Sequence, residues 1–344
     1  MQHEKYIRRC LELAANGIGT ARPNPSVGAV IVHDYKIIGE GYTSPYGGNH
    51  AEVNAINSVK DPTLLKESTL YVTLEPCSHF GKTPPCADLI VEHQIPDVVI
   101  GCVDTNELVA GKSIERLKNA GCNVTVGILE EECLQHHRRF FTNQNKKRPF
   151  IILKWAETKD GFIAPLHRND QKPVWITNEK SRQLVHKWRG EEHAILVGTN
   201  TVKADDPKLT IRDWTGENPI RIVIDKELKL SNELHVFDGS VLTIVVTEKD
   251  KENEENVIFE KIDFSKDVPK QIVAALYAHR IQSVIVEGGT VTLQTFIDGN
   301  LWDEANVFIG DVLFKEGIKA PILSAKKISE ERILLDVLKR YRND

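Results

Sequence analysis

A histidine and two cysteines in the first third of the chain are spaced as the ligands of a catalytic zinc ion would be. His50 lies at the start of an expected helix, Cys77 follows the strand-like segment 69–74, and Cys86 begins the next helical pattern. One imidazole and two thiolates supply three protein ligands and leave the fourth zinc position open for water. We therefore predict a Zn2+ site at His50, Cys77 and Cys86.

Glu52 occupies the place where such a site needs a proton shuttle. It lies two residues after His50, close enough to reach a zinc-bound water without being a ligand. Zinc lowers the pKa of its water toward ~7, and a carboxylate here can carry the proton to a ring nitrogen and then to a departing amine. His-x-Glu followed by Pro-Cys-x-x-Cys is the signature of zinc nucleobase deaminases. This chain departs from it, because eight residues separate Cys77 from Cys86.

A structural zinc site is the alternative interpretation of the same cluster. Such a site takes four protein ligands, and His79 could be the fourth. The remaining cysteines lack comparable partners and are expected to pack in the core: Cys10, Cys102, Cys122 and Cys133. His136 and His137 are expected on a helix surface.

The elements that must position these residues alternate between strands and helices. Apolar runs predict strands at residues 27–32, 36–41, 69–74, 97–103 and 123–127. Helical patterns occur at residues 4–16, from about residue 51, and at 87–92, 113–119 and 130–141. This alternation predicts a layered α/β sandwich. The polar stretch 142–149 marks a boundary between a first domain, residues 1–147, and a second, residues 148–344.

The α/β alternation restarts in the second domain. Strands are expected at residues 150–156, 194–197, 220–224, 241–246 and 283–286, and helices at 178–189, at 270–279 and after Gly289. The charged run between residues 248 and 267 is expected to be a solvated loop. A turn at residues 286–290 carries two glycines and could present backbone N–H groups to a phosphate. Because no Gly-x-Gly-x-x-Gly follows the first strand, a standard Rossmann dinucleotide site is not supported.

Composition narrows the class of protein further. With 41% hydrophobic and 27% charged residues and no apolar run long enough to cross a bilayer, the chain reads as a globular protein without a membrane span. A net charge of −5, with basic residues spread among acidic ones, argues against nucleic acid and favours a small-molecule substrate. The N-terminus does not resemble a secretory signal, so a cytoplasmic location is expected. Whether the chain forms a homo-oligomer is left open.

Three motifs together resemble the bifunctional riboflavin-biosynthesis deaminase/reductase family. They are Arg22-Pro23-Asn24-Pro25-Ser26-Val27-Gly28-Ala29-Val30, His50-Ala51-Glu52, and the segment from Glu75 to Cys86, whose long insertion between the cysteines is typical of that family. The resemblance implies a cytidine-deaminase-like three-layer sandwich that deaminates diaminohydroxyphosphoribosylaminopyrimidine. It further implies that Asn24 contacts the pyrimidine and that Lys82 and Thr83 lie near the ribose phosphate. Asp104 and Gly111-Lys112 also match, although a plain turn explains them equally well.

The second domain is similar to the same family's reductase domain from about residue 148 to 310. The matching segments are Leu153-Lys154-Trp155-Ala156, Trp175-Ile176-Thr177, the run from Gly198 to Thr210, and Val286-Glu287-Gly288-Gly289. The resemblance implies a dihydrofolate-reductase-like fold and NADPH-dependent reduction of the ribosyl to the ribityl side chain, after deamination. It implies NADPH contacts from Ala156, Trp175, Thr201, Asp205, Gly289 and Thr290. Substrate contacts carry over to Lys154, Arg189, Leu209, Arg212 and Glu287.

The chain departs from the family in places, and other functions stay open. Residues 157–159 differ from the usual sequence, Pro173 stands where a serine is common, and the pattern after Phe308 is blurred. One rival is a cytidine-type or tRNA-adenosine-type deaminase with an unrelated C-terminal domain, which the long cysteine spacing disfavours. Another is a zinc-stabilised nucleotide-binding protein, which would hold zinc and NADPH but turn over neither intermediate.

Overall fold

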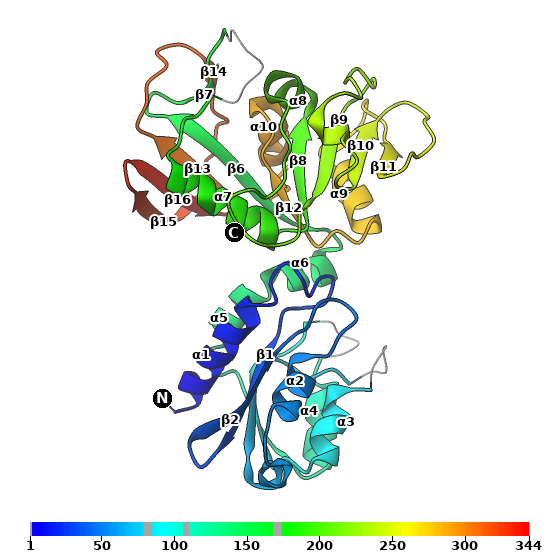
Figure 1. Cartoon of the computed structure of the whole chain (residues 1–344), viewed down its shortest axis with the longest axis vertical. Coiled ribbons are helices and arrows are strands. Elements are labelled where there is room, and N and C mark those ends of the chain that lie inside the picture. Colours follow the sequence, from blue (N-terminus) through cyan, green and yellow to red (C-terminus); the bar gives the residue numbers. More distant parts are fainter. Residues whose placement is uncertain (1, 79–83, 106–109, 168–173, 344) are drawn as a thin grey trace. The chain divides into compact units, whose positions relative to one another are not determined.

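The computed structural model of the chain describes residues 2–78, 84–105, 110–167 and 174–343. It divides into two compact units, Met1–Lys147 and Arg148–Asp344. Each unit contains its own central sheet with helices packed on it (Figure 1). The two units are therefore described separately.

The first unit is built on a mixed sheet with strand order β2-β1-β3-β4-β5. β1 pairs antiparallel with β2 and β3, whereas β3, β4 and β5 run parallel. Parallel strands end at the same edge of a sheet, so the segments that follow β3 and β4 are neighbours. The strands are β1 (Gly28–His33), β2 (Lys36–Tyr42), β3 (Thr69–Leu74), β4 (Asp97–Cys102) and β5 (Asn123–Val126).

Helices cover both faces of this sheet and give three layers, with α1 and α5 on one side and α2, α3 and α4 on the other (Figure 1). α1 buries Tyr6, Ile7, Cys10 and Leu13, which recur at the spacing of one helical face. The bounds are α1 (Gln2–Ala15), α2 (Ala51–Asn57), the 3-10 helix η1 (Pro62–Glu67), α3 (Cys86–Glu92), α4 (Lys112–Asn119), α5 (Glu130–His136) and α6 (Arg138–Lys146).

The second unit is built on a larger sheet with strand order β11-β10-β9-β8-β12-β6-β13-β16-β15. The strands from β11 to β13 run parallel, and β16 and β15 continue the sheet antiparallel. Its strands are β6 (Phe150–Thr158), β8 (Ala194–Gly198), β9 (Ile220–Ile224), β10 (Thr243–Thr247), β11 (Val257–Lys261), β12 (Ser283–Val286), β13 (Glu304–Gly310), β15 (Lys326–Ile333) and β16 (Asp336–Arg342), beside a separate pair, β7 (Phe162–Ala164) and β14 (Ile318–Lys319).

Apolar side chains on the two faces of this sheet form separate clusters. Ile272 and Leu276 of α9 and Leu293 and Phe296 of α10 pack on one face. Val185 of α7 and Val202 of α8 belong to smaller clusters with other strand residues. The helices are α7 (Glu179–Glu191), α8 (Thr199–Asp205), the 3-10 helix η2 (His235–Phe237), α9 (Val268–Ala278) and α10 (Thr290–Asp298).

Three local expectations were wrong. Residues 142–146, expected in a polar linker, form the second half of α6, where Phe141 and Thr142 are buried. His137, expected on a helix surface, is only 2% exposed. The charged run 248–267 contains β11, whose Val257 is buried as the edge strand pairs with β10. The buried cysteines were predicted correctly for Cys10, Cys102 and Cys133, while Cys122 is half-buried.

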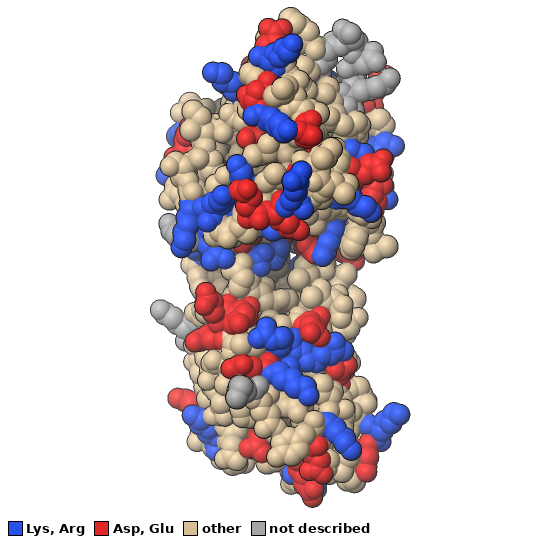
Figure 2. Space-filling model, turned by 90° about the vertical axis from the view of Figure 1, so that its left-hand side faces the viewer, with Lys and Arg blue, Asp and Glu red and all other residues tan. Residues whose placement is uncertain are grey.

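Charged side chains of both signs are interspersed on the face of the molecule shown in Figure 2. This pattern agrees with the composition, in which 44 basic residues stand against 49 acidic ones. Within the part of the chain that the structure describes, no helix is long and apolar enough to cross a membrane.

Candidate active sites of the two units

The three predicted zinc ligands converge in the first unit. The Nδ1 atom of His50 lies 3.5 Å from the Sγ of Cys77 and 3.3 Å from the Sγ of Cys86. All three ligand atoms lie within 4.8 Å of one another. Tetrahedral zinc with bond lengths of about 2.0 Å to nitrogen and 2.3 Å to sulfur requires N–S separations of roughly 3.5 Å. The donor set and its spacing therefore fit a zinc ion.

Local structure holds each of these ligands in place. His50 is the extended residue that precedes α2, Cys77 lies in the segment after β3, and Cys86 is the first residue of α3. The backbone N–H of Cys86 donates to the Sγ of Cys77 at 3.3 Å, a bond that favours a thiolate. Hydrogen bonding from Cys86, which together with His50 outweighs the effect of burial, lowers the pKa of Cys77 to about 4. Cys77 is thus ready to bind a metal in its anionic form.

Glu52 lies in the first turn of α2 and is only 4% exposed. Burial, helped by the nearby Cys77, raises the pKa of its carboxyl to about 7. A carboxyl with a pKa near neutrality can both take up and release a proton under physiological conditions. Glu52 is therefore suited to proton transfer next to the His50–Cys77–Cys86 cluster.

The segment that contains Asn24 lies beside the chain that leads to His50. Thr43 donates from its backbone to Val27, and Tyr46 donates to Thr20, so the two segments run next to each other. Asn24 itself is half-buried in a turn that follows Arg22-Pro23, a cis peptide bond. The turn that contains Asn24 therefore lies near the segment that leads into α2.

Several residues discussed from the sequence lie outside the described residues. These are Lys82 and Thr83, expected near the ribose phosphate, His79, the alternative fourth zinc ligand, and Pro173.

Glu75, which sequence reasoning did not single out, links two segments at the same edge of the sheet. Its Oε2 accepts from the backbone N–H groups of Asp104 at 3.3 Å and Gly111 at 3.0 Å. Its Oε1 accepts from the backbone N–H and the hydroxyl of Ser113, at 3.2 and 2.8 Å. The buried carboxylate therefore ties the chain after β4 to the residue two positions before Cys77. Its place directly before Pro76-Cys77 is the signal that could have revealed it.

In the second unit, Glu287 brings two basic side chains together. Its Oε2 accepts from Arg189 Nη2 at 2.9 Å, and its Oε1 lies 3.6 Å from Lys154 Nζ. Burial acts to raise the pKa of Glu287, but the charges of Arg189 and Lys154 outweigh it and hold the pKa at about 2. Burial lowers the pKa of Lys154. Three predicted substrate residues thus form one half-buried charged cluster.

This cluster has unused hydrogen-bonding capacity. Glu287 Oε1 and Arg189 Nε are buried without a hydrogen-bond partner among the described residues. Buried polar atoms without hydrogen-bond partners are rare in folded proteins, and a catalytic role or a bound water or ion is a usual explanation. The cluster therefore has the character of a binding site rather than of a closed structural ion pair.

Arg212 lies close to Arg189, in a segment that also contacts α7. The Nη1 of Arg189 donates to the Thr210 carbonyl at 3.2 Å, and His186 Nδ1 accepts from the Arg212 backbone N–H at 3.4 Å. Partial burial and the charge of Arg189 lower the pKa of Arg212. An anion bound between the guanidinium groups of Arg189 and Arg212 would reduce the repulsion between their positive charges. Phosphate suits this place, because a guanidinium group can donate to two of its oxygens.

The glycine turn after β12 lies against the start of α8. The backbone N–H of Gly289 donates to Thr201 Oγ1 at 2.9 Å, and Thr290 begins α10. A Cβ atom on Gly288 would lie 2.5 Å from the backbone nitrogen of Gly198, so only glycine allows this approach of the two turns. Three predicted NADPH contacts, at Thr201, Gly289 and Thr290, are therefore neighbours.

The other predicted cofactor and substrate contacts are more dispersed. Asp205 ends α8, and Ala156 lies in β6 and packs near Phe308. Trp175 is 57% exposed, and the Arg182 guanidinium lies 4.5 Å from the centre of its ring. The side chain of Leu209 is buried in the core with Val197 and its neighbours, so it does not line an open surface.

The fold and the first site define the chain as a zinc-binding deaminase domain joined to a second α/β domain. Residues 1–102 match the cytidine and deoxycytidylate deaminase zinc-binding region, and residues 149–325 match the RibD C-terminal domain. The riboflavin biosynthesis protein RibD of Aquifex aeolicus is 40% identical over 95% of this chain and 92% of its own length. The Escherichia coli RibD is 35% identical over 91% of this chain and 89% of its own length.

Solved structures give the same result over the whole chain. A diaminohydroxyphosphoribosylaminopyrimidine deaminase/5-amino-6-(5-phosphoribosylamino)uracil reductase from Thermotoga maritima superposes with a TM-score of 0.91, at 40% identity, and covers 99% of this chain and 98% of its own. RibD of Acinetobacter baumannii superposes with a TM-score of 0.88, at 30% identity, over the same shares of both chains.

The chain belongs to the RibD family of bifunctional deaminase/reductases in riboflavin biosynthesis. The predicted family, the α/β fold with a cytidine-deaminase-like and a reductase domain, and the pair of activities are confirmed. Zinc and NADPH are confirmed as the cofactors, and the substrate is a small molecule. Neither alternative function is favoured.

Proposed function

We propose that residues 1–147 deaminate 2,5-diamino-6-(5-phosphoribosylamino)pyrimidin-4(3H)-one and that residues 148–344 then reduce the product. The observation that carries the first assignment is the convergence of His50, Cys77 and Cys86 beside the buried Glu52. The six cysteines are free thiols, as expected in a reducing compartment, so we place both reactions in the cytoplasm.

In the deaminase, His50, Cys77 and Cys86 hold the zinc ion, which when bound supplies a Lewis acid that makes water nucleophilic near neutral pH. Water adds to the ring carbon that carries the amine, and ammonia leaves. Glu52 takes the proton from the attacking water, passes it to the ring nitrogen and then transfers a proton to the departing amine. Asn24 binds the pyrimidine.

In the reductase, Arg189 and Arg212 bind the substrate phosphate with their guanidinium groups. Glu287 and Lys154 lie next to the reacting sugar, and the backbone near Leu209 forms part of the same site. Reduction adds a hydride from NADPH and one proton. Burial lowers the pKa of Lys154, which makes its ammonium a better acid, so Lys154 is our candidate for the proton donor.

NADPH is held by the glycine turn and the elements around it. The N–H groups in the first turn of α10, which begins at Thr290, suit a phosphate of the cofactor, because helix N-termini attract anions. Thr201 and Asp205 of α8, together with Gly289, Ala156 and Trp175, would help to hold NADPH.

A Glu52→Gln variant tests both the role of this residue and the order of the reactions. The amide cannot accept and return a proton, so the variant should keep its zinc and lose deamination by about 10²-fold or more. Glu115→Gln, on the exposed surface of α4, is the matched control and should deaminate normally.

The order is read from NADPH absorbance in the Glu52→Gln protein. Deamination converts an amine, which donates hydrogen bonds, into a carbonyl, which accepts them. A reductase site that pairs with the carbonyl would leave a buried polar group unpaired if the amine were bound instead. We expect NADPH oxidation with the deaminated compound only. Equal rates of NADPH oxidation with the diaminopyrimidine phosphate would contradict this order. If the variant deaminates within tenfold of the wild-type rate, Glu52 is not the residue that transfers the proton.

A further inference from the structure

The turn between Asp206 and Leu209 has a strained backbone. Asp206 has a φ of 40° and Leu209 a φ of 57°, both in the left-handed region that non-glycine residues rarely adopt. The turn lies between Asp205 and Arg212, to which we assign contacts with NADPH and with the substrate phosphate. Strained backbone persists only where surrounding contacts hold it, and such positions concentrate at functional sites.

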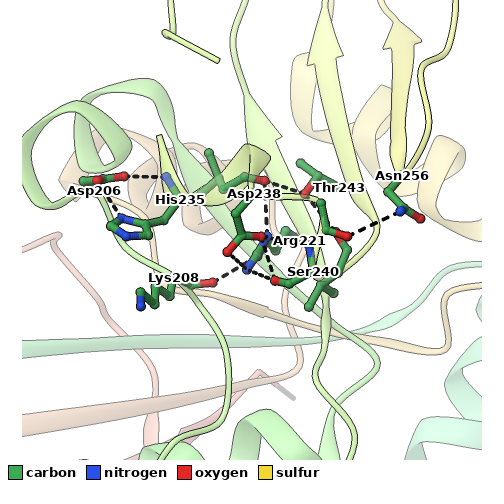
Figure 3. A network of polar contacts seen from close by, with 11 residues as sticks. Asp206, Lys208, Arg221, His235, Asp238, Ser240, Thr243 and Asn256 are labelled. Atoms are coloured by element: carbon green, nitrogen blue, oxygen red, sulfur yellow. Dashed lines mark hydrogen bonds and ion pairs between the residues drawn. The ribbon is translucent and has the colours of Figure 1, made fainter. Parts of the chain in front are cut away.

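Arg221 on β9 supplies one of these contacts from inside the protein. Its side chain is fully buried, and its Nε donates to the Lys208 carbonyl at 2.9 Å (Figure 3). Its Nη1 donates to Asp238 Oδ1 at 2.7 Å, and its Nη2 donates to the Ser240 hydroxyl at 3.1 Å. One planar guanidinium thus joins the strained turn to the segment 235–240.

The same segment holds the turn at a second point. Asp206 Oδ1 accepts from the backbone N–H of His235 at 2.8 Å, and Asp206 Oδ2 lies 2.6 Å from His235 Nδ1 (Figure 3). Thr243 donates its hydroxyl to the Val236 carbonyl at 2.7 Å and so fixes the segment to β10. Two residues of the turn, Asp206 and Lys208, are therefore tied to the segment 235–240, directly and through Arg221.

We propose that Arg221 is a positioning residue of the reductase, which holds the turn 206–209 so that Asp205 and Arg212 meet NADPH and the substrate phosphate together. The proposal rests on the functions proposed above for Asp205 and Arg212. Arg221 itself contacts neither ligand in this scheme and acts through the backbone carbonyl of Lys208.

The chemistry of the contact favours this role over simple core packing. A fully buried arginine is expensive to desolvate, and apolar residues of similar volume often stabilise a core as well or better. Apolar side chains cannot, however, fix a carbonyl in a strained turn while they also bind a second segment. Arginine does both, because its donors point in fixed directions from one rigid plane.

Arg221→Lys isolates the contact with the turn. Lysine keeps a positive charge beside Asp238 but has one ammonium group, which cannot span Asp238, Ser240 and the Lys208 carbonyl as the guanidinium fork does. We expect the KM values for NADPH and for the deaminated substrate to rise together, by about tenfold, while kcat changes less than threefold. A joint rise is the signature of one turn that serves both ligands.

Arg148→Lys is the matched control in the same unit. Arg148 also forms a two-bond ion pair, partly buried, donating to Asp303 at 2.5 and 2.7 Å. Its replacement should lower the melting temperature and leave both KM values within twofold of the wild type. His235→Leu, at an exposed position, provides a second test if Arg221→Lys does not fold, and it should raise both KM values about threefold.

The outcomes separate this proposal from the function on which it rests. Unchanged KM values in a folded Arg221→Lys protein, or an equal rise in Arg148→Lys, would overturn the positioning role while the wild type still reduces its substrate. If Arg221→Lys does not fold, unchanged KM values in His235→Leu would overturn it as well. A wild-type protein that binds zinc but does not oxidise NADPH with the deaminated compound would overturn the proposed reductase function, and the positioning role with it.

Discussion

Replacement of Glu75 by glutamine should destabilise the first unit far more than its similar shape suggests. The carboxylate accepts four hydrogen bonds, two on each oxygen, from Asp104, Gly111 and Ser113. A glutamine retains one oxygen and replaces the other with an NH2 group. In its best orientation the NH2 faces Ser113, whose hydroxyl can turn to accept, and the Ser113 backbone N–H is left without an acceptor.

The size of the effect follows from these contacts. A buried N–H that loses its acceptor costs about 1–3 kcal/mol, and hydrogen bonds to a charged acceptor are about twice as strong as those to a neutral one. We expect a loss of about 2–4 kcal/mol in the free energy of unfolding. For a unit of this size the midpoint of thermal unfolding should fall by roughly 5–15 °C.

Differential scanning calorimetry of the whole chain, with zinc release as the reporter of the first unit, measures this shift. Asp61→Asn is the matched control, since Asp61 is exposed and caps η1 by accepting from Thr63, a role that asparagine fills equally well. If zinc release in Glu75→Gln begins within 2 °C of the control, the account of Glu75 as a satisfied buried carboxylate is wrong.

Two further predictions concern the first unit. Cys77→Ser should lose its zinc and its deaminase activity and still reduce the deaminated compound at the wild-type rate; full zinc content with normal deamination would refute the ligand assignment. Burial lowers the pKa of His137 well below 6.5, so the unfolded chain binds a proton below pH 6.5 that the folded unit does not, and stability is lost as the pH falls. Between pH 6.5 and 5 the wild type should lose more stability than His137→Gln in urea titrations, and parallel losses in both proteins would contradict the burial argument.

Buried strands were the elements that the sequence predicted best. The predicted bounds of β3, β9 and β12 match the structure, because each is a short run rich in β-branched residues with polar or turn residues at its ends. The zinc ligands were predictable for a related reason. Each of them follows a strand or begins a helix, and such positions meet at one edge of a sheet.

Elements that depend on tertiary contacts were not predictable. Polar residues continue α6 through Lys146, because one face of that helix packs on the core while the rest stays in water. His137 was expected on a helix surface, yet its ring is buried and its Nε2 lies 3.1 Å from the hydroxyl of Thr73, 64 positions earlier in the chain. Nothing in the local sequence encodes these distant partners.

The residues that support the two sites from inside the protein were not predictable from the sequence either. Arg221 lies in an apolar strand pattern, where a single arginine resembles a solvent-facing residue, and its partners are 13 to 19 positions away. Glu287 was found only through the family resemblance, because its ion pairs reach Lys154 of β6 and Arg189 of α7, which are far away in the chain. The sequence thus predicted the clustering of His50, Cys77 and Cys86, but not the buried residues Glu75 and Arg221, whose partners lie far away in the chain.

The strand order of the second unit has a consequence for the order in which the chain can fold during synthesis. β6 is the first strand of this unit to be made, yet its two neighbours in the sheet are β12 and β13, which begin at Ser283 and Glu304. At a translation rate of about 5–20 residues per second, the 133 residues from Phe150 to Ser283 take roughly 7 to 27 seconds to make. Throughout that interval a nascent chain carries an apolar strand with both edges open, which is a hazard for aggregation. Ribosome-associated chaperones should therefore stay bound to residues 150–158 until β12 has emerged from the ribosome.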